Sequence, residues 1–148
     1  MNIKDNQMRI SENAINKIKE FEGLRLTSYR CPAGILSIGH GHTKGVKMGQ
    51  VITKAQAESL LRGDLLPCEE YVRGLNLELT QGQFDALVDF CFNLGTGALG
   101  RSTLLQKIRT KADELTIRNE FAKWVNAGGV RLQGLVKRRA WEADRYFE

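Results

Sequence analysis

The sequence predicts an α+β fold that is mostly helical and contains one small antiparallel β-sheet. Apolar residues recur at helical spacing over most of the chain, whereas residues 24–52 show short apolar alternations broken by glycine and proline. A sheet inserted between helices divides a chain into two lobes, and the cleft between lobes is a common place for an active site. We therefore expect a single domain over residues 1–148, with a small β lobe at about residues 24–52 and a helical lobe made by the remainder.

The first expected helix has a clear start and a clear end. Ser11 is placed to cap its N-terminus, and Gly23 is placed to stop it. Glu22 therefore lies at the C-terminal end of the helix. The only β-like region follows, where short alternations broken by glycine and proline predict a small antiparallel sheet with hairpin turns: LTSYR, CPAG, ILSIGHGH and VKMGQV.

The later helices begin at capping boxes and surround one apolar helix. Thr53 with Gln56 starts a long helix that Pro67 is expected to bend, and Thr80 with Gln83 starts the next one. This next helix contains FDALVDFCFNLG, which is apolar on nearly all sides and typical of a buried central helix. Three glycines should break it before three amphipathic segments: Gly95, Gly97 and Gly100, then STLLQKI, ELTIRNEFAKWVNAG and LVKRRAWEADRYF.

The composition is that of an ordinary globular protein. Its 148 residues are 42% hydrophobic and 26% charged, and no repeat or low-complexity linker divides them. No stretch is apolar for long enough to span a membrane or act as a secretory signal, so we expect no stable membrane insertion and no leader. Cys31, Cys68 and Cys91 have no paired spacing, which predicts reduced thiols rather than a disulfide framework or a zinc site.

The net charge of +5 favours an anionic partner. Nucleic acid, an anionic membrane and the bacterial cell wall all have this charge, and a basic surface also simply improves solubility. The chain has no helix-turn-helix, zinc-finger or RNA-binding motif, so we expect no nucleic-acid partner.

The stretch FEGLRLTSYRCPAGILSIGHGHT resembles the active-site segment of the T-even phage lysozyme family of muramidases. In that family EGLRL-x-x-Y, then Asp or Cys, then G-x-x-T-I-G-x-G-H recur. The similarity continues in the family's order through three more stretches: TKAQAESLLRGDL, LTQGQFDALVDFCFNLGTGALGRSTLL and FAKWVNAGG…GLVKRRAWE. The resemblance implies a lysozyme-like fold and an endolysin that needs no cofactor. Such an enzyme hydrolyses the β-1,4 bond between N-acetylmuramic acid and N-acetylglucosamine in peptidoglycan and so lyses the host cell.

Glu22, Cys31 and Ser37 match the catalytic positions of that family. Glycoside hydrolysis requires a proton donor for the leaving oxygen, and a carboxyl at a helix C-terminus, where an anion is disfavoured, suits this task. Cys31 stands where Asp is common, and Ser37 where Thr is usual. We expect both to position the attacking water, while direct attack by a Cys31 thiolate stays the alternative. A further alternative is a catalytically impaired lysozyme-like protein that only binds the cell wall.

The resemblance also assigns a structural pair and a set of substrate contacts. His42 is expected to pair with Asp64 and to join the sheet to the helical lobe. No metal site is expected, because His40 and His42 have no evident third ligand. The expected substrate-binding residues are Phe92, Asn93, Arg138 and Arg139, although Phe92 suits a core position and the arginines suit a solvated helix face equally well.

The resemblance finally implies where the protein acts. We expect a monomer that stays in the host cytoplasm until a separate membrane-permeabilising phage protein releases it, and that then attacks peptidoglycan in the periplasm. A cationic enzyme would be held near this anionic polymer.

Overall fold

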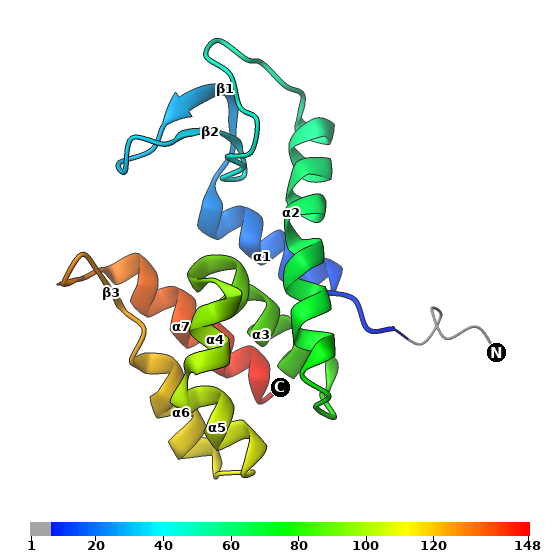
Figure 1. The fold of residues 1–148 in the computed structure, drawn as a ribbon, viewed down its shortest axis with the longest axis vertical. Coiled ribbons are helices and arrows are strands. Elements are labelled where there is room, and N and C mark those ends of the chain that lie inside the picture. The colour runs from blue at the N-terminus through cyan, green and yellow to red at the C-terminus, as the bar shows by residue number, and fades with distance from the viewer. Residues whose placement is uncertain (1–6) are drawn as a thin grey trace. The chain divides into compact units, whose positions relative to one another are not determined.

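The computed structural model describes residues 7–148 and confirms the mostly helical α+β fold (Figure 1). The expectation that the chain has no leader concerns residues 1–6 among others, and these six lie outside the described residues. The elements in chain order are α1 (Glu12–Glu22), β1 (Arg25–Arg30), β2 (Leu36–Gly39), α2 (Lys54–Gly74), α3 (Gln81–Leu94), α4 (Thr96–Arg101), α5 (Thr103–Arg109), α6 (Glu114–Ala122), β3 (Asn126–Ala127), β4 (Val130–Arg131) and α7 (Gln133–Tyr146).

The chain forms two compact units whose boundaries lie inside helices. One unit is Ile15–Pro67, and we call it the 15–67 unit. The other, the helical unit, combines Cys68–Glu148 with the residues up to Ala14. The expected β lobe at 24–52 therefore lies within a larger unit that also contains most of α1 and the first part of α2. Helix α2 continues through Pro67, although proline donates no backbone hydrogen bond.

The 15–67 unit is built on a short antiparallel ladder. Strand β1 pairs with β2 in a register that places Tyr29 opposite Ser37, with an irregularity nearer the start of β1. An isolated bridge between Thr27 and Val51 extends the pairing. The ladder covers a small apolar core whose members come from β1, β2, the following loop and α2: Leu26, Ile38, Val46, Ile52, Ala57 and Leu60.

The predicted helix ends and caps are confirmed. Ser11 Oγ accepts the backbone N–H of Ala14 at 3.1 Å, and Gly23 ends α1 with φ +74° while its N–H donates to Lys19 O at 2.9 Å. The two capping boxes are also present: Thr53 with Gln56, and Thr80 with Gln83.

Helix α3 is the core of the helical unit, as its apolar run predicts. Its buried residues form a nearly continuous stretch, and Phe90 meets the rings of Phe121 and Trp124 edge to face. Helices α3 and α7 pack so closely that a Cβ on Gly82 would clash with the carbonyl oxygen of Arg145. This packing determines which faces of α3 and α7 are buried.

Two local expectations were wrong. Residues 24–52 are not the only β region, since β3 and β4 form a second small hairpin around Gly128 and Gly129, whose φ values are +57° and +79°. Of the three glycines expected to break α3, only Gly95 does so, with φ +97°. Gly97 and Gly100 lie inside the short helix α4, where a Cβ would press on the side chains of Arg101 and Tyr71. Across residues 7–148, no helix has the length and apolarity needed to cross a membrane.

Candidate active site

Glu22 is the last residue of α1 and is partly buried in the 15–67 unit. Gly41 lies directly against its carboxylate, because a Cβ built on Gly41 would be 2.9 Å from Glu22 Oε1. Gly41 also has φ +81°, a conformation that side-chain-bearing residues rarely adopt. A glycine is thus required here for two reasons, and one of them is the position of the Glu22 carboxylate.

Cys31 lies in the tight turn that joins β1 to β2. Its N–H donates to Ile35 O at 2.9 Å, and its own carbonyl accepts the N–H of Gly34 at 2.8 Å. The pKa of the Cys31 thiol is lowered from its usual value, chiefly because the Ile35 N–H points at the sulfur. Partial burial opposes this effect, and hydrogen bonds from the Ala33 N–H and the Ser37 hydroxyl add to it. The turn therefore favours a thiolate.

Ser37 lies on β2 and is 3% exposed. Its hydroxyl donates to Ile35 O at 3.2 Å, and it contributes to the lowered pKa of Cys31. The structure thus brings together two of the three predicted catalytic residues, which are adjacent because the β1–β2 register places Ser37 next to the turn.

His42 and Asp64 form the expected pair. His42 Nδ1 lies 2.8 Å from Asp64 Oδ2, and His42 Nε2 lies 2.8 Å from Lys44 O. Both ring nitrogens therefore face acceptors. Because Asp64 is on the part of α2 that belongs to the 15–67 unit, the pair fastens the loop after β2 to α2 within that unit.

His40 makes a contact that the sequence does not predict. In the structure its Nδ1 donates to Gly23 O at 2.6 Å, and the residue is 7% exposed. No cluster of three or more His, Cys, Asp or Glu that could hold a metal occurs among the described residues. No sequence pattern indicated the contact with Gly23, because it joins segments 17 residues apart.

Arg138 and Arg139 are both buried in the helical unit. Arg138 Nη2 lies 2.7 Å from Asp89 Oδ1, and the side chains of Arg138 and Asp89 are 6% and 0% exposed. Arg139 Nε lies 2.8 Å from Glu142 Oε1, while its Nη2 donates to Asn93 Oδ1 at 2.7 Å. Contact of these arginines with sugar stays a prediction, and their burial argues instead for a role inside the unit.

Glu142 is completely enclosed in this network. Burial is the main cause that raises the pKa of its carboxyl well above the usual value, and the neighbouring Asp89 raises it further. Arg139 and Arg138 act in the opposite direction. Phe92 and Asn93 lie at the end of α3 with partly exposed side chains, and their contact with sugar rings stays a prediction.

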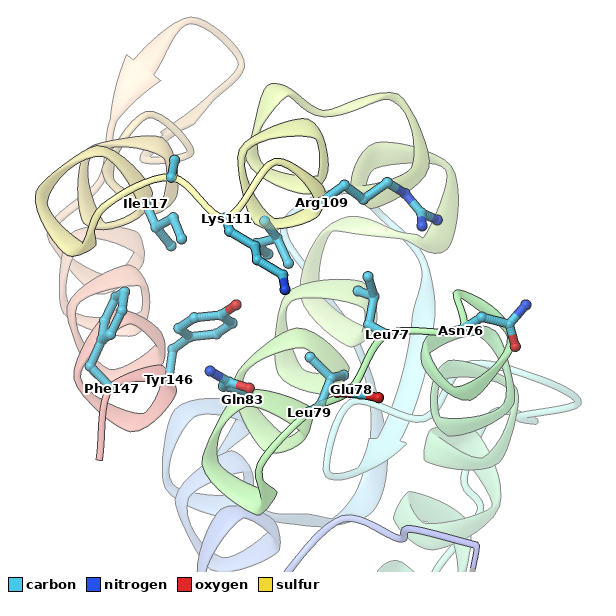
Figure 2. Close-up of a pocket in the computed structure, with 12 residues that line it drawn as sticks. Asn76, Leu77, Glu78, Leu79, Gln83, Arg109, Lys111, Ile117, Tyr146 and Phe147 are labelled. Atoms are coloured by element: carbon cyan, nitrogen blue, oxygen red, sulfur yellow. The ribbon is translucent and has the colours of Figure 1, made fainter.

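The helical unit also contains a pocket of about 580 Å³ that holds none of the predicted site residues. Figure 2 shows Tyr146, Phe147 and Gln83 on one side of it, with Arg109 from the end of α5 and Lys111 from the segment that follows. No pattern in the sequence predicts this pocket, because its lining comes from three separate stretches of chain.

A family model described as phage lysozyme matches residues 19–142. The match includes all nine residues singled out from the sequence as catalytic, substrate-binding or structural. It also includes both the β1–β2 turn and the buried network of the helical unit.

Individual relatives extend this similarity to nearly the whole chain. An endolysin of Acyrthosiphon pisum secondary endosymbiont phage 1 is 41% identical over 140 residues, which cover 91% of this chain and 95% of that protein. An endolysin of Bacillus phage B103 is 45% identical over 95% of this chain, which spans only 54% of that longer protein. The solved muramidase domain of SpmX from Asticaccaulis excentricus is 38% identical with a TM-score of 0.87, covering 95% of this chain and 98% of that domain.

Proposed function

This chain belongs to the phage lysozyme family and is a peptidoglycan-degrading glycoside hydrolase, and we propose that it cleaves the β-1,4 bond between N-acetylmuramic acid and N-acetylglucosamine. The observation that supports this most directly is the adjacency of Cys31 and Ser37, which the pairing of β1 with β2 brings about in the unit where α1 ends at Glu22. Glycoside hydrolysis needs a proton donor and a group that prepares the nucleophile, and these residues supply both.

Glu22 is the proposed general acid. It is the last residue of α1, and its side chain is partly buried. Gly41 lies against Oε1 and restricts where this carboxyl can point. In the reaction, Glu22 would protonate the leaving glycosidic oxygen as the bond to the sugar carbon breaks.

Cys31 and Ser37 are proposed to hold the attacking water. A hydroxyl can donate and accept hydrogen bonds at once, so Ser37 can accept from a water while it donates to Ile35 O. The lowered pKa of Cys31 increases the share of its thiolate form, to which the same water can donate. Water added opposite the leaving group would give a product of inverted anomeric configuration.

The place of action follows from the family. Endolysins act on the cell wall, and we propose that this chain waits in the host cytoplasm until a separate membrane-permeabilising phage protein releases it. Its net charge of +5 supports attraction to anionic peptidoglycan. Action as a monomer, and the joining of both units into one catalytic domain, stay predictions.

Two measurements on the full chain test this function. Permeabilised Gram-negative cells should clear when the protein is added, whereas a protein that only binds walls would sediment with them and leave the turbidity unchanged. NMR of the first product from a defined peptidoglycan fragment should show inverted configuration. Retained configuration, with a glycosyl thioether on Cys31 detected by mass spectrometry, would instead establish direct attack by the thiolate.

A further inference from the structure

We propose that His40 is a positioning residue that holds the catalytic carboxyl of Glu22 in place through the carbonyl of Gly23. The inference rests on the proposed role of Glu22 as the acid. It concerns Gly23, which follows the last residue of α1. The role given to His40 is neither metal binding nor the pairing that links His42 to Asp64.

The contact itself is short and protected from water. His40 Nδ1 lies 2.6 Å from Gly23 O, and His40 is 7% exposed. A carbonyl oxygen only accepts, so Nδ1 must carry the proton in this contact. The bond orients the peptide that follows Gly23, one residue beyond Glu22.

This peptide needs an external anchor. Glu22 ends α1, and helix ends leave carbonyl groups without partners inside the helix. Gly23 has no side chain and takes the left-handed conformation, with φ +74°. The Gly23 N–H donates to Lys19 O at 2.9 Å, so the bond from His40 to Gly23 O restricts the other side of this residue, where the chain leaves the helix that carries Glu22.

The turn that carries His40 is itself held tightly. Ile38 and His42 exchange two backbone hydrogen bonds of 2.9 Å, which close a loop of three residues between them. Two of these are Gly39 and Gly41, with φ +69° and +81°, and His40 lies between them. At the base of the loop, the His42 ring bonds to Asp64 on α2.

The same turn contacts Glu22 from a second direction. Gly41, the residue after His40, lies so close to Glu22 Oε1 that a Cβ there would be 2.9 Å away. The turn thus touches the carboxylate with Gly41 and holds the following backbone with His40. If the His40 ring fixes the end of α1 relative to this turn, loss of the ring contact should affect the chemical step more than substrate binding.

Three substitutions test the proposal in the full-length protein. The amide nitrogen of Asn reaches the place of a histidine Nδ1, whereas that of Gln reaches the place of Nε2, and Phe keeps the ring without a donor. With a soluble peptidoglycan fragment as substrate, we expect His40→Phe and His40→Gln to lose about 10- to 100-fold in kcat with little change in KM. His40→Asn should stay within about threefold of the parent, by the same reasoning.

The measurements separate positioning from stability. Melting midpoints of all three variants are recorded, and kcat is measured well below them. Equal kcat values for His40→Asn and His40→Gln, or full kcat in His40→Phe, would overturn the proposal. Nitrogen-15 NMR of the parent gives a readout that needs no variant: the His40 ring should be protonated at Nδ1, and a proton found only on Nε2 would also overturn it.

A control keeps this proposal distinct from the proposed function. If Glu22→Gln lyses cells as fast as the parent, the assignment of the acid fails whatever the His40 variants do. If Glu22→Gln is inactive while the His40 variants all match the parent, the acid stands and the positioning role fails.

Discussion

The two units bury polar groups in different ways. In the helical unit the buried polar side chains are mostly charged and held in ion pairs, such as Asp89 with Arg138 and Glu142 with Arg139. Of the residues described in the 15–67 unit, the buried polar side chains are Ser37 and His40, and both face backbone carbonyls. The helical unit thus connects its helices by charge, whereas the 15–67 unit places single groups against its backbone.

The glycines repeat this contrast. Six glycines with positive φ lie in the 15–67 unit: Gly23, Gly34, Gly39, Gly41, Gly45 and Gly49. In the helical unit three glycines have positive φ, namely Gly95, Gly128 and Gly129, and others such as Gly82 permit close packing between helices. We infer that changes next to Glu22 and in the β1–β2 turn should act mainly on catalysis, and changes to the charged network mainly on stability.

The largest effect is expected at Glu22. Glu22→Gln keeps the shape of the side chain but removes the transferable proton, so the lysis rate should fall by about 10² to 10⁴. The melting midpoint should change little, since the carboxyl is not part of a buried core. Turbidity clearing and calorimetry on the same preparation measure both, and lysis within a few-fold of the parent would reject Glu22 as the acid.

Asp89→Ala tests the other half of the comparison. Removing one partner of a buried ion pair commonly costs about 3–5 kcal/mol, so urea unfolding should show a loss of this size. Activity per folded molecule should be kept. Asp144→Asn is the control, because its partner Arg118 lies in an exposed pair that contributes little to the free energy of unfolding. Equal losses in the two variants would show that burial of the Asp89 pair is unimportant.

Cys31 should reveal its lowered pKa through its reactivity. Alkylation by iodoacetamide should reach its maximum rate at a lower pH than for an unfolded cysteine, whose pKa is about 8.5. Cys91 should stay unmodified, since burial raises the pKa of its thiol. The hydrogen bonds to the Cys31 sulfur lower the pKa of this thiol in the folded protein. Their stabilisation is therefore present above the pKa of the unfolded thiol and is lost as pH falls through the pKa of the folded one.

Substitutions of Cys31 distinguish water positioning from other roles of this residue. Cys31→Asp should remain active and resist inactivation by iodoacetamide, because a carboxylate can also orient a water. Cys31→Ala should be severely impaired in the clearing assay. Full activity in Cys31→Ala would mean that neither water positioning nor direct attack by this sulfur is needed.

Gly41→Ala should lower activity through the position of Glu22. The new methyl group would lie 2.9 Å from Oε1, at the movable end of a side chain, so the carboxyl should shift and kcat should fall about tenfold. Gly45→Ala has a matching φ of +70° but nothing within 4 Å, and it controls for backbone strain. If both variants lose kcat equally, strain rather than contact is the cause.

The smallest effect is expected for His42 and Asp64. The pair is 13% and 30% exposed, so a double-mutant cycle of His42→Asn and Asp64→Asn should give a coupling of about 0.5–1 kcal/mol in the free energy of unfolding. Lysis at permissive temperature should be affected less than the melting midpoint. Strictly additive losses would contradict the interaction.

Local features of this protein were within reach of its sequence. The caps at Ser11, Thr53 and Thr80 and the helix end at Gly23 involve residues only three or four apart, so spacing alone predicted them. The buried helix α3 was also predicted, because a helix that is apolar on all sides has to be enclosed.

Other features depended on packing between distant segments. Spacing places Arg138 and Arg139 on one helix, but only the approach of α3 to α7 buries both beside Asp89 and Glu142. The hairpin at Gly128 was missed because strands of two residues are too short to show alternation. The bond from His40 to Gly23 is also invisible in the sequence, since it exists only where the turn of residues 38–42 folds back onto the end of α1. The sequence alone determined which chemical groups are present and where the helices begin and end, because short-range hydrogen bonds depend on neighbouring residues. Tertiary structure decided which of those groups meet, because burial and contact depend on segments that are distant along the chain.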